Sequence, residues 1–131
     1  MEYLIVFMAA FGAFVFGSIW YSLLSKPWMA AAGIKRGDDG KPIGGNMFLP
    51  FVLSGIAMLL VSGMMRHMFN MADIHTVGKG LTSGLGVGLF FISPWIMINN
   101  AYGMRPFKLT IIDGGYAFFG CGIIGLMLTI I

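Results

Sequence analysis

Apolar residues form four long runs along this chain. No Asp, Glu, Lys or Arg occurs in residues 3–25, 42–65, 80–104 or 114–131. A helix needs about 20 apolar residues to cross about 30 Å of hydrocarbon. Because lipid cannot satisfy unpaired backbone groups, and because the runs lack strict alternation, each one predicts a transmembrane helix rather than a barrel strand. The expected helices cover about residues 3–25, 47–70, 79–103 and 111–131.

Composition agrees with a bilayer environment. The 131 residues are 58% hydrophobic and 10% charged, with a mean hydropathy of +0.88. These values are typical of integral membrane proteins. We expect a single all-α domain over residues 1–131, with four transmembrane helices. A 2+2 repeat of helix pairs is suggested by two basic-Pro-aromatic triplets, Lys26-Pro27-Trp28 after the first helix and Arg105-Pro106-Phe107 after the third.

Basic residues are distributed unevenly between the connections. The second connection is flanked only by Arg66 and Lys79, whereas six basic residues follow the first and third helices: Lys26, Lys35, Arg36, Lys41, Arg105 and Lys108. Cytoplasmic loops carry an excess of Lys and Arg. We therefore expect a multi-pass protein of the bacterial inner membrane, with loops 26–46 and 104–110 in the cytoplasm and both termini outside. Trp20, Tyr21 and Trp28 are then expected to form an aromatic belt at the cytoplasmic interface.

Small residues recur at four-residue spacing on three of the expected helices. The first helix carries Ala9, Ala13 and Gly17. The third helix carries Gly80, Gly84 and Gly88, and the fourth carries Ala117, Cys121 and Gly125. Such rows let helix backbones approach closely in a membrane. They predict either a seam within the chain or an interface between chains. The second interpretation favours a non-enzymatic accessory or assembly subunit, working in a homo-oligomer or a larger membrane complex.

Most of the polar chemistry lies between Asn99 and Tyr116. Two interpretations are open for this stretch. Thr110 and Asp113 stand three residues apart and resemble a capping box at the start of the fourth helix. Alternatively, Arg105 pairs with Asp113, and Asn99 and Asn100 bind a polar headgroup or a small ligand at the inner membrane surface, because polar groups in a membrane are expensive.

Pro94 lies in the middle of the third expected helix and predicts a kink there. The ring removes one backbone donor, and the Ser93 hydroxyl can satisfy a freed carbonyl. A broken helix beside a polar site is typical of transporters. The alternative function is therefore an oligomeric small-molecule or ion transporter with its site at Asn99, Asn100, Arg105 and Asp113.

A segment rich in Met and His ends the second expected helix. If the helix continued beyond residue 70, thioether and imidazole groups would share one stripe, with the residues Met64, His67, Met68, Met71 and His75. These groups suit copper(I), which makes copper binding a lesser alternative. Methionine is also a flexible packing residue, and this chain contains 12 of them.

Other functional classes have little support in the sequence. Active-site chemistry needs a nucleophile placed beside a base, and no such combination is evident, so we do not expect an enzyme. No cofactor is expected apart from copper. The net charge of +3 arises at positions that flank the helices, which indicates membrane lipids as partners and not nucleic acid.

Two blocks of the sequence resemble a known family. The first block is Gly17-Ser18-Ile19-Trp20-Tyr21 followed by Lys26-Pro27-Trp28-Met29, and the second runs from Asn99-Asn100 through Arg105-Pro106-Phe107-Lys108-Leu109 to Asp113-Gly114-Gly115-Tyr116. They are similar to the bacterial membrane proteins labelled domain of unknown function 1761. The resemblance implies a small four-helix protein of the inner membrane. It implies no activity and carries no catalytic residues to this chain.

Overall fold

The computed structural model describes residues 2–35, 37–38 and 48–130, and this part of the chain is all-helical. Four helices are long and apolar enough to span a membrane: Tyr3–Leu23, Phe48–Met71, Val77–Tyr102 and Phe107–Ile130. The predicted fold class is therefore confirmed. The expected first residue of the second helix, residue 47, and the expected last residue of the fourth, residue 131, lie outside the described residues.

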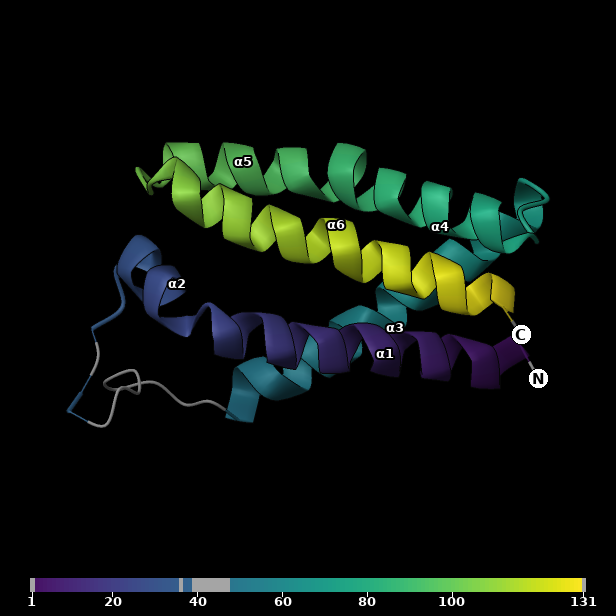
Figure 1. The fold of residues 1–131 in the computed structure, drawn as a ribbon, viewed down its shortest axis with the longest axis horizontal. Coiled ribbons are helices and arrows are strands. Elements are labelled where there is room, and N and C mark those ends of the chain that lie inside the picture. Colours follow the sequence, from purple (N-terminus) through teal and green to yellow (C-terminus); the bar gives the residue numbers. More distant parts are fainter. Residues whose placement is uncertain (1, 36, 39–47, 131) are drawn as a thin grey trace.

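The elements follow one another as α1 (Glu2–Leu23), α2 (Ser25–Ala32), α3 (Phe48–Met71), α4 (Val77–Gly86), the π-helix η1 (Val87–Ile92), α5 (Ser93–Tyr102) and α6 (Phe107–Ile130). The long helices run side by side. Both termini and the α3–α4 turn lie at one end, and α2 and the α5–α6 turn lie at the other (Figure 1).

The central helix of the bundle is α6. It packs against α4, η1 and α5 on one side and against α1 on the other (Figure 1). Helix α3 packs mainly on α1. In the most apolar stretch of α6, 44% is buried, against 11% to 28% in the other three spans. The bundle is thus two hairpins, α1–α3 and α4/η1/α5–α6, joined through α1 and α6. This is the pairing that a 2+2 repeat needs, although the repeat itself stays a prediction.

Small side chains hold α1 against its neighbours. Ala9 and Ala13 are fully buried in the core formed with α3 and α6. The buried hydroxyl of Ser62 on α3 donates to the carbonyl of Val6 at 2.9 Å, which ties the first hairpin together without an unsatisfied polar group. The other members of this core are also apolar: Ile5, Met65, Phe69, Cys121, Ile124 and Leu128.

The rows of small residues on α4/η1 and on α6 face each other within the chain. A Cβ at Gly84 would overlap the carbonyl oxygen of Cys121, and a Cβ at Gly88 would overlap that of Ala117. Gly80 approaches the carbonyl of Gly125 equally closely. The seam between α4/η1 and α6 is therefore intrachain. These two rows are therefore not available as a surface for another chain, and the accessory-subunit role stays a prediction.

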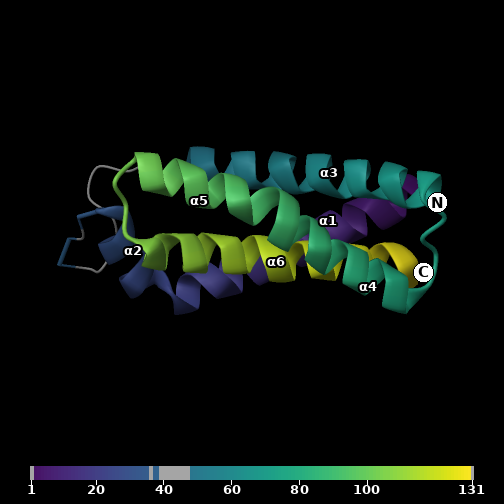
Figure 2. The ribbon, with the colours of Figure 1, turned by 90° about the horizontal axis from the view of Figure 1, so that it is seen from above.

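The third span changes its helical form directly before Pro94. The backbone N–H of Ser93 bonds to the carbonyl of Gly88, five residues earlier, at the end of the π-helix η1. The Ser93 hydroxyl lies 2.7 Å from the same carbonyl oxygen and 3.1 Å from that of Gly114 on α6. Proline cannot donate a backbone hydrogen bond, and π-turns accommodate such defects inside helices. The chain crosses over α6 at this point (Figure 2).

Three helices end in the same way, with one residue in the left-handed conformation. These residues are Gly33 after α2, Asp73 after α3 and Met104 after α5, with φ of 75°, 58° and 55°. In each case the next amide bonds back to a carbonyl five residues earlier. This is the Schellman motif, which satisfies carbonyls at a helix end. Glycine adopts the conformation freely, so Met104 and Asp73 occupy it at some cost.

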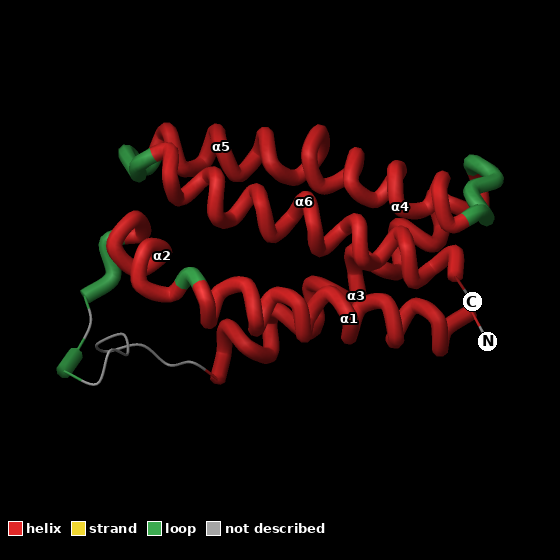
Figure 3. Tube along the Cα trace, viewed as in Figure 1, coloured by secondary structure: helices red, strands yellow, loops and turns green. Residues whose placement is uncertain are grey.

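A short helix replaces part of the expected first connection. The sequence predicts one helix to residue 25 and then a solvated loop, but α1 ends at Leu23 and α2 follows after a break at Leu24 (Figure 3). Met29, Ala31 and Ala32 of α2 are buried, and the two alanines pack on Leu109 of α6. The rest of the connection includes residues 36 and 39–47, which lie outside the described residues.

Candidate functional site

An open cleft of about 580 Å³ lies at the end of the bundle that carries α2 and the α5–α6 turn. This volume falls within the range of small-molecule sites. All four polar residues predicted from the sequence line it. Its lining consists of residues from α2, the end of α5 and the start of α6: Trp28, Ala32, Gly33, Ile34, Asn99, Asn100, Gly103, Arg105, Leu109 and Asp113.

Arg105 reaches the cleft from the α5–α6 turn. It is the residue that follows Met104, so the left-handed turn sets its direction. One terminal N–H of the guanidinium donates to the carbonyl of Ala32, the last residue of α2. A cation at a helix C-terminus is favourable, and the planar guanidinium has further N–H donors for another group.

Asp113 is the acidic residue of the cleft and lies within the membrane-spanning part of α6. It stands six residues after the start of the helix, which corresponds to about 9 Å along the axis. The Tyr21 hydroxyl donates to its Oδ1 at 2.6 Å, and Trp28 Nε1 donates to the same oxygen at 3.1 Å. Oδ2 accepts no hydrogen bond from the described residues and is not among their fully buried atoms. The protein therefore holds one carboxylate oxygen through two donors, and the other has no donor among the described residues.

The expected ion pair between Arg105 and Asp113 is not formed. Both side chains line the cleft, but within the described part of the chain Arg105 bonds to α2, whereas Asp113 bonds to Tyr21 and Trp28. A positive and a negative group thus share one cavity without neutralising each other.

The expected capping box is also wrong. Helix α6 begins at Phe107, not near residue 111, so Thr110 lies in its first turn and Asp113 in its second. The Thr110 hydroxyl accepts instead from Asn100 Nδ2 at 3.1 Å, which fixes the end of α5 beside α6. Asn99 is exposed at the cleft, and Asn100 is half-buried.

Sequence reasoning missed the two donors that hold Asp113. Tyr21 and Trp28, with Trp20, were expected to face lipid headgroups in an aromatic belt. Instead they donate to α6, because Trp20 Nε1 bonds to the Ile112 carbonyl at 2.9 Å and the other two bond to Asp113. The sequence did contain a chemical signal for this contact. A carboxylate inside a membrane needs hydrogen-bond donors, and the hydroxyl and indole N–H groups near the end of α1 can supply them.

A second, mostly apolar cavity has a volume of about 380 Å³. It lies between α3, the η1–α5 segment and α6, and Asp113 and Tyr21 border it. Asp113 therefore lines both cavities. The remaining lining residues are apolar or weakly polar: Met58, Val61, Ile92, Ile96, Tyr116, Ala117, Gly120, Cys121 and Ile124.

Comparison with known proteins gives a family for the chain. The family model described as "Protein of unknown function (DUF1761)" matches residues 4–129, nearly the whole sequence. The chain belongs to the DUF1761 family. A search of curated proteins found no match, and a search of solved structures found none.

The structure gives a physical relation between the two sequence blocks that resemble DUF1761 proteins. The first block contributes Tyr21 and Trp28, and the second contributes Asp113, which accepts a hydrogen bond from each of them. Separations of 92 and 85 residues divide these partners along the chain. The two blocks of this DUF1761 chain are thus the two halves of one polar contact, located at the boundary between the cleft and the apolar cavity.

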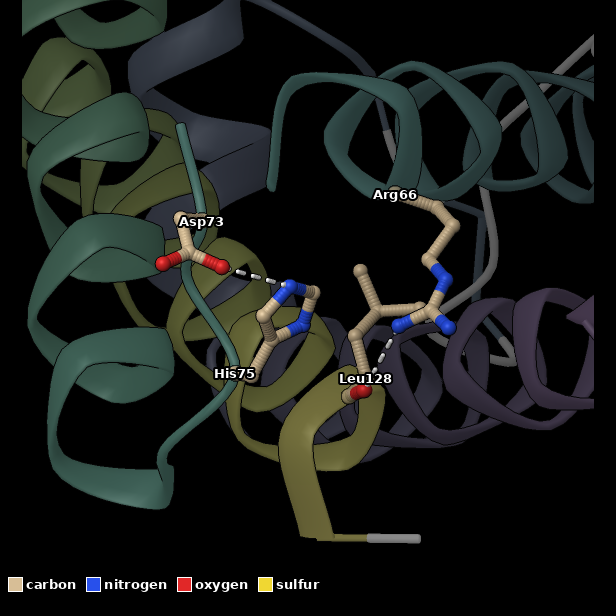
Figure 4. A network of polar contacts seen from close by, with 4 residues as sticks. All are labelled: Arg66, Asp73, His75 and Leu128. Atoms are coloured by element: carbon tan, nitrogen blue, oxygen red, sulfur yellow. Dashed lines mark hydrogen bonds and ion pairs between the residues drawn. The ribbon is translucent and has the colours of Figure 1, made fainter. Parts of the chain in front are cut away.

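The Met/His segment of the DUF1761 chain does not form the expected stripe. Helix α3 ends at Met71, and the left-handed Asp73 turns the chain, so His75 is not on the helix. His75 Nε2 lies 3.2 Å from Asp73 Oδ1 instead (Figure 4). Nearby, Arg66 of α3 donates to the carbonyl of Leu128 at 3.2 Å, which fastens α3 to the end of α6 (Figure 4). Copper binding stays a prediction, but the continuous helix on which the Met and His stripe depended is not formed.

Proposed function

We propose that this protein binds a small ligand carrying both an anionic and an ammonium group in the cleft at the α2 end of the bundle. The observation that carries the proposal is the separation of Arg105 and Asp113, which line one cavity but bond to different partners. A ligand with both charges can pair with each of them. Asn99 and Asn100, on the same wall, supply amide groups for its uncharged polar atoms.

The anionic group of the ligand is assigned to Arg105. Guanidinium groups bind phosphates and carboxylates through paired N–H donors. Arg105 is held at its base by the turn and at its tip by Ala32, so little side-chain entropy remains to be lost on binding.

The ammonium group is assigned to Asp113. Tyr21 and Trp28 together fix Oδ1, and Oδ2 accepts no hydrogen bond from the described residues, so this oxygen is the acceptor we assign to the ligand. An ammonium donor at this oxygen would compensate a charge that lies within the membrane-spanning helix, where an uncompensated charge is expensive.

The proposal is binding, not catalysis. Among the described residues, the cleft is lined by amides, a guanidinium, a carboxylate, an indole and apolar groups, with no Ser, Cys, His or Lys. A binding protein also fits better than an accessory subunit that assembles through its small residues, since these residues pack within the chain. Assembly of several copies, for example in a transporter, stays a prediction.

The cleft is proposed to face the cytoplasm from the bacterial inner membrane. The support is the charge distribution, since the basic residues concentrate in the two connections at this end of the bundle. Ligands would then reach the site from the cytoplasmic side or from the inner leaflet.

Binding of a soluble probe to purified protein in a maltoside detergent tests this proposal. Glycerophosphoethanolamine carries both charges, whereas glycerophosphate lacks the ammonium group. We expect Arg105→Ala to weaken binding of both probes by about tenfold or more, the loss of a hydrogen-bonded charge pair. Asp113→Asn keeps the hydrogen-bond acceptor but removes the charge, so it should weaken only the probe that contains ammonium.

Lys108→Ala is the matched control. Lys108 is exposed and follows Arg105 by three residues, but it does not line the cleft. Its removal should leave both affinities within about twofold, a difference of about 0.4 kcal/mol. The proposal fails if the unmodified protein binds neither probe, or if Arg105→Ala and Lys108→Ala weaken binding equally.

A further inference from the structure

We infer that the ligand is a membrane phospholipid, with its headgroup in the cleft and one acyl chain in the apolar cavity. The inference rests on the proposed function, because it names the ligand class of the same cleft. It goes further because it assigns an occupant to a second site, the apolar cavity between α3, η1–α5 and α6. Binding of a headgroup in the cleft does not by itself require this second site. Both sites would then be filled by a single amphiphilic molecule.

The two cavities meet at one residue. Asp113 lines the polar cleft on one side and the apolar cavity on the other, and Tyr21, which bonds to it, also borders the apolar cavity. The lining is polar on the cleft side of Asp113 and mostly apolar on the other side. A phospholipid has the same arrangement, since its polar headgroup is joined to apolar acyl chains.

The length of the apolar cavity matches one leaflet of a bilayer. On α6 its lining runs from Asp113 to Ile124, which are 11 residues apart. A helix rises about 1.5 Å per residue, so the lining extends about 16 Å along α6. One leaflet contributes about 15 Å of hydrocarbon. An acyl chain that starts at Asp113 would therefore extend along α6 by about the thickness of one leaflet, as far as Ile124.

The position of the cavity makes an acyl chain its natural occupant. It is bounded by α3 on one side and by η1–α5 on the other, and α3 packs mainly on α1 and only lightly on α6. Its walls are Ile, Val, Met, Ala and aromatic side chains, which offer few partners for water. In a bilayer, lipid acyl chains surround the protein. One of these chains can enter the apolar cavity without removing water from polar groups.

Lipid retention measured by native mass spectrometry tests the inference. Delipidated protein in maltoside detergent is incubated with dioleoyl phosphatidylethanolamine, and bound lipid is counted as the detergent is removed in the gas phase. Gly120 lines the apolar cavity, and a Cβ there meets only the Tyr116 ring at ordinary contact distance. Gly120→Leu should therefore fill the cavity and lower lipid occupancy by about tenfold or more, while binding of glycerophosphoethanolamine stays within about twofold.

Gly55→Leu is the matched control. Gly55 lies on α3, where an added Cβ would meet no heavy atom within 4 Å, and it does not line the cavity. This variant should retain lipid like the unmodified chain. Ile96→Trp fills the same cavity from α5 and replaces Gly120→Leu if that variant does not fold.

The inference is overturned if both cavity-filling variants retain lipid as Gly55→Leu does, or if they lose the soluble headgroup together with the lipid. In the first case the proposed function stands, provided that glycerophosphoethanolamine still binds in an Arg105-dependent way. Failure of the unmodified protein to bind that soluble probe would instead overturn the proposed function, and the inference with it.

Discussion

The hydroxyl of Tyr21 donates a 2.6 Å hydrogen bond to Asp113, which joins the end of α1 to the second turn of α6. Trp28 of α2 donates to the same carboxylate oxygen. Three elements, α1, α2 and α6, thus converge on one charged group. The residues of this contact line both cavities, because Trp28 and Asp113 line the polar cleft and Tyr21 and Asp113 line the apolar cavity.

Tyr21→Phe should destabilise the protein by about 1–3 kcal/mol, because it removes a donor from a partly buried carboxylate. Unfolding in mixed micelles with increasing dodecyl sulfate gives the free energy. Tyr102→Phe, at a residue that is 88% exposed, is the control and should change little. In an Asp113→Ala background, Tyr21→Phe should lower the free energy of unfolding much less, because the hydrogen bond is already absent and only packing of the ring is altered. An undiminished effect in that background would show that the hydrogen bond is not its source.

Gly84→Ala should weaken the seam between α4 and α6 by about 1–3 kcal/mol or more, because its Cβ would overlap a backbone carbonyl that cannot move aside alone. Gly86→Ala is the matched control two residues away, where no heavy atom lies within 4 Å of an added Cβ. It should be neutral or slightly stabilising, since alanine favours helix. The same unfolding measurement compares them. Equal stability of the two variants would contradict an intrachain seam.

Met104→Gly should stabilise the α5–α6 turn by about 0.5–1 kcal/mol. Met104 has φ of 55°, a conformation that glycine adopts without a clash between Cβ and the carbonyl. The same substitution at Met97, inside α5, should destabilise by about 1 kcal/mol because glycine is a poor helix former. Opposite signs in the two unfolding curves are the expected result. A loss of stability at both positions would exclude relief of strain at residue 104.

Cysteine labelling should reveal the orientation of the bundle. Met104→Cys places an exposed thiol in the α5–α6 turn, and His75→Cys places one in the α3–α4 turn at the opposite end. Native Cys121 is buried. In intact spheroplasts a membrane-impermeant maleimide should label residue 75 and not residue 104, and inverted vesicles should give the reverse. The reversed pattern in spheroplasts would place the cleft outside.

Much of the architecture can be predicted from the sequence, because the physical requirements are local. A bilayer demands about 20 apolar residues per span, so the charge-free runs predict four helices. Four-residue spacing predicts that Gly80, Gly84 and Gly88 share one helix face. Pro94 predicts a defect nearby, and the structure places the π-helix η1 directly before it.

The fold class of this protein was thus determined by its sequence alone, and the four polar residues predicted as a site, Asn99, Asn100, Arg105 and Asp113, all line the cleft. The tertiary structure decided which groups meet. Gly84 faces Cys121 of the same chain, not another copy, and Asp113 faces Tyr21 and Trp28, not Arg105. The reason is that spacing along a helix determines only which residues share a face. The partner of that face depends on the rotation, register and crossing of helices that are distant in sequence, and these are settled only when all the helices pack together.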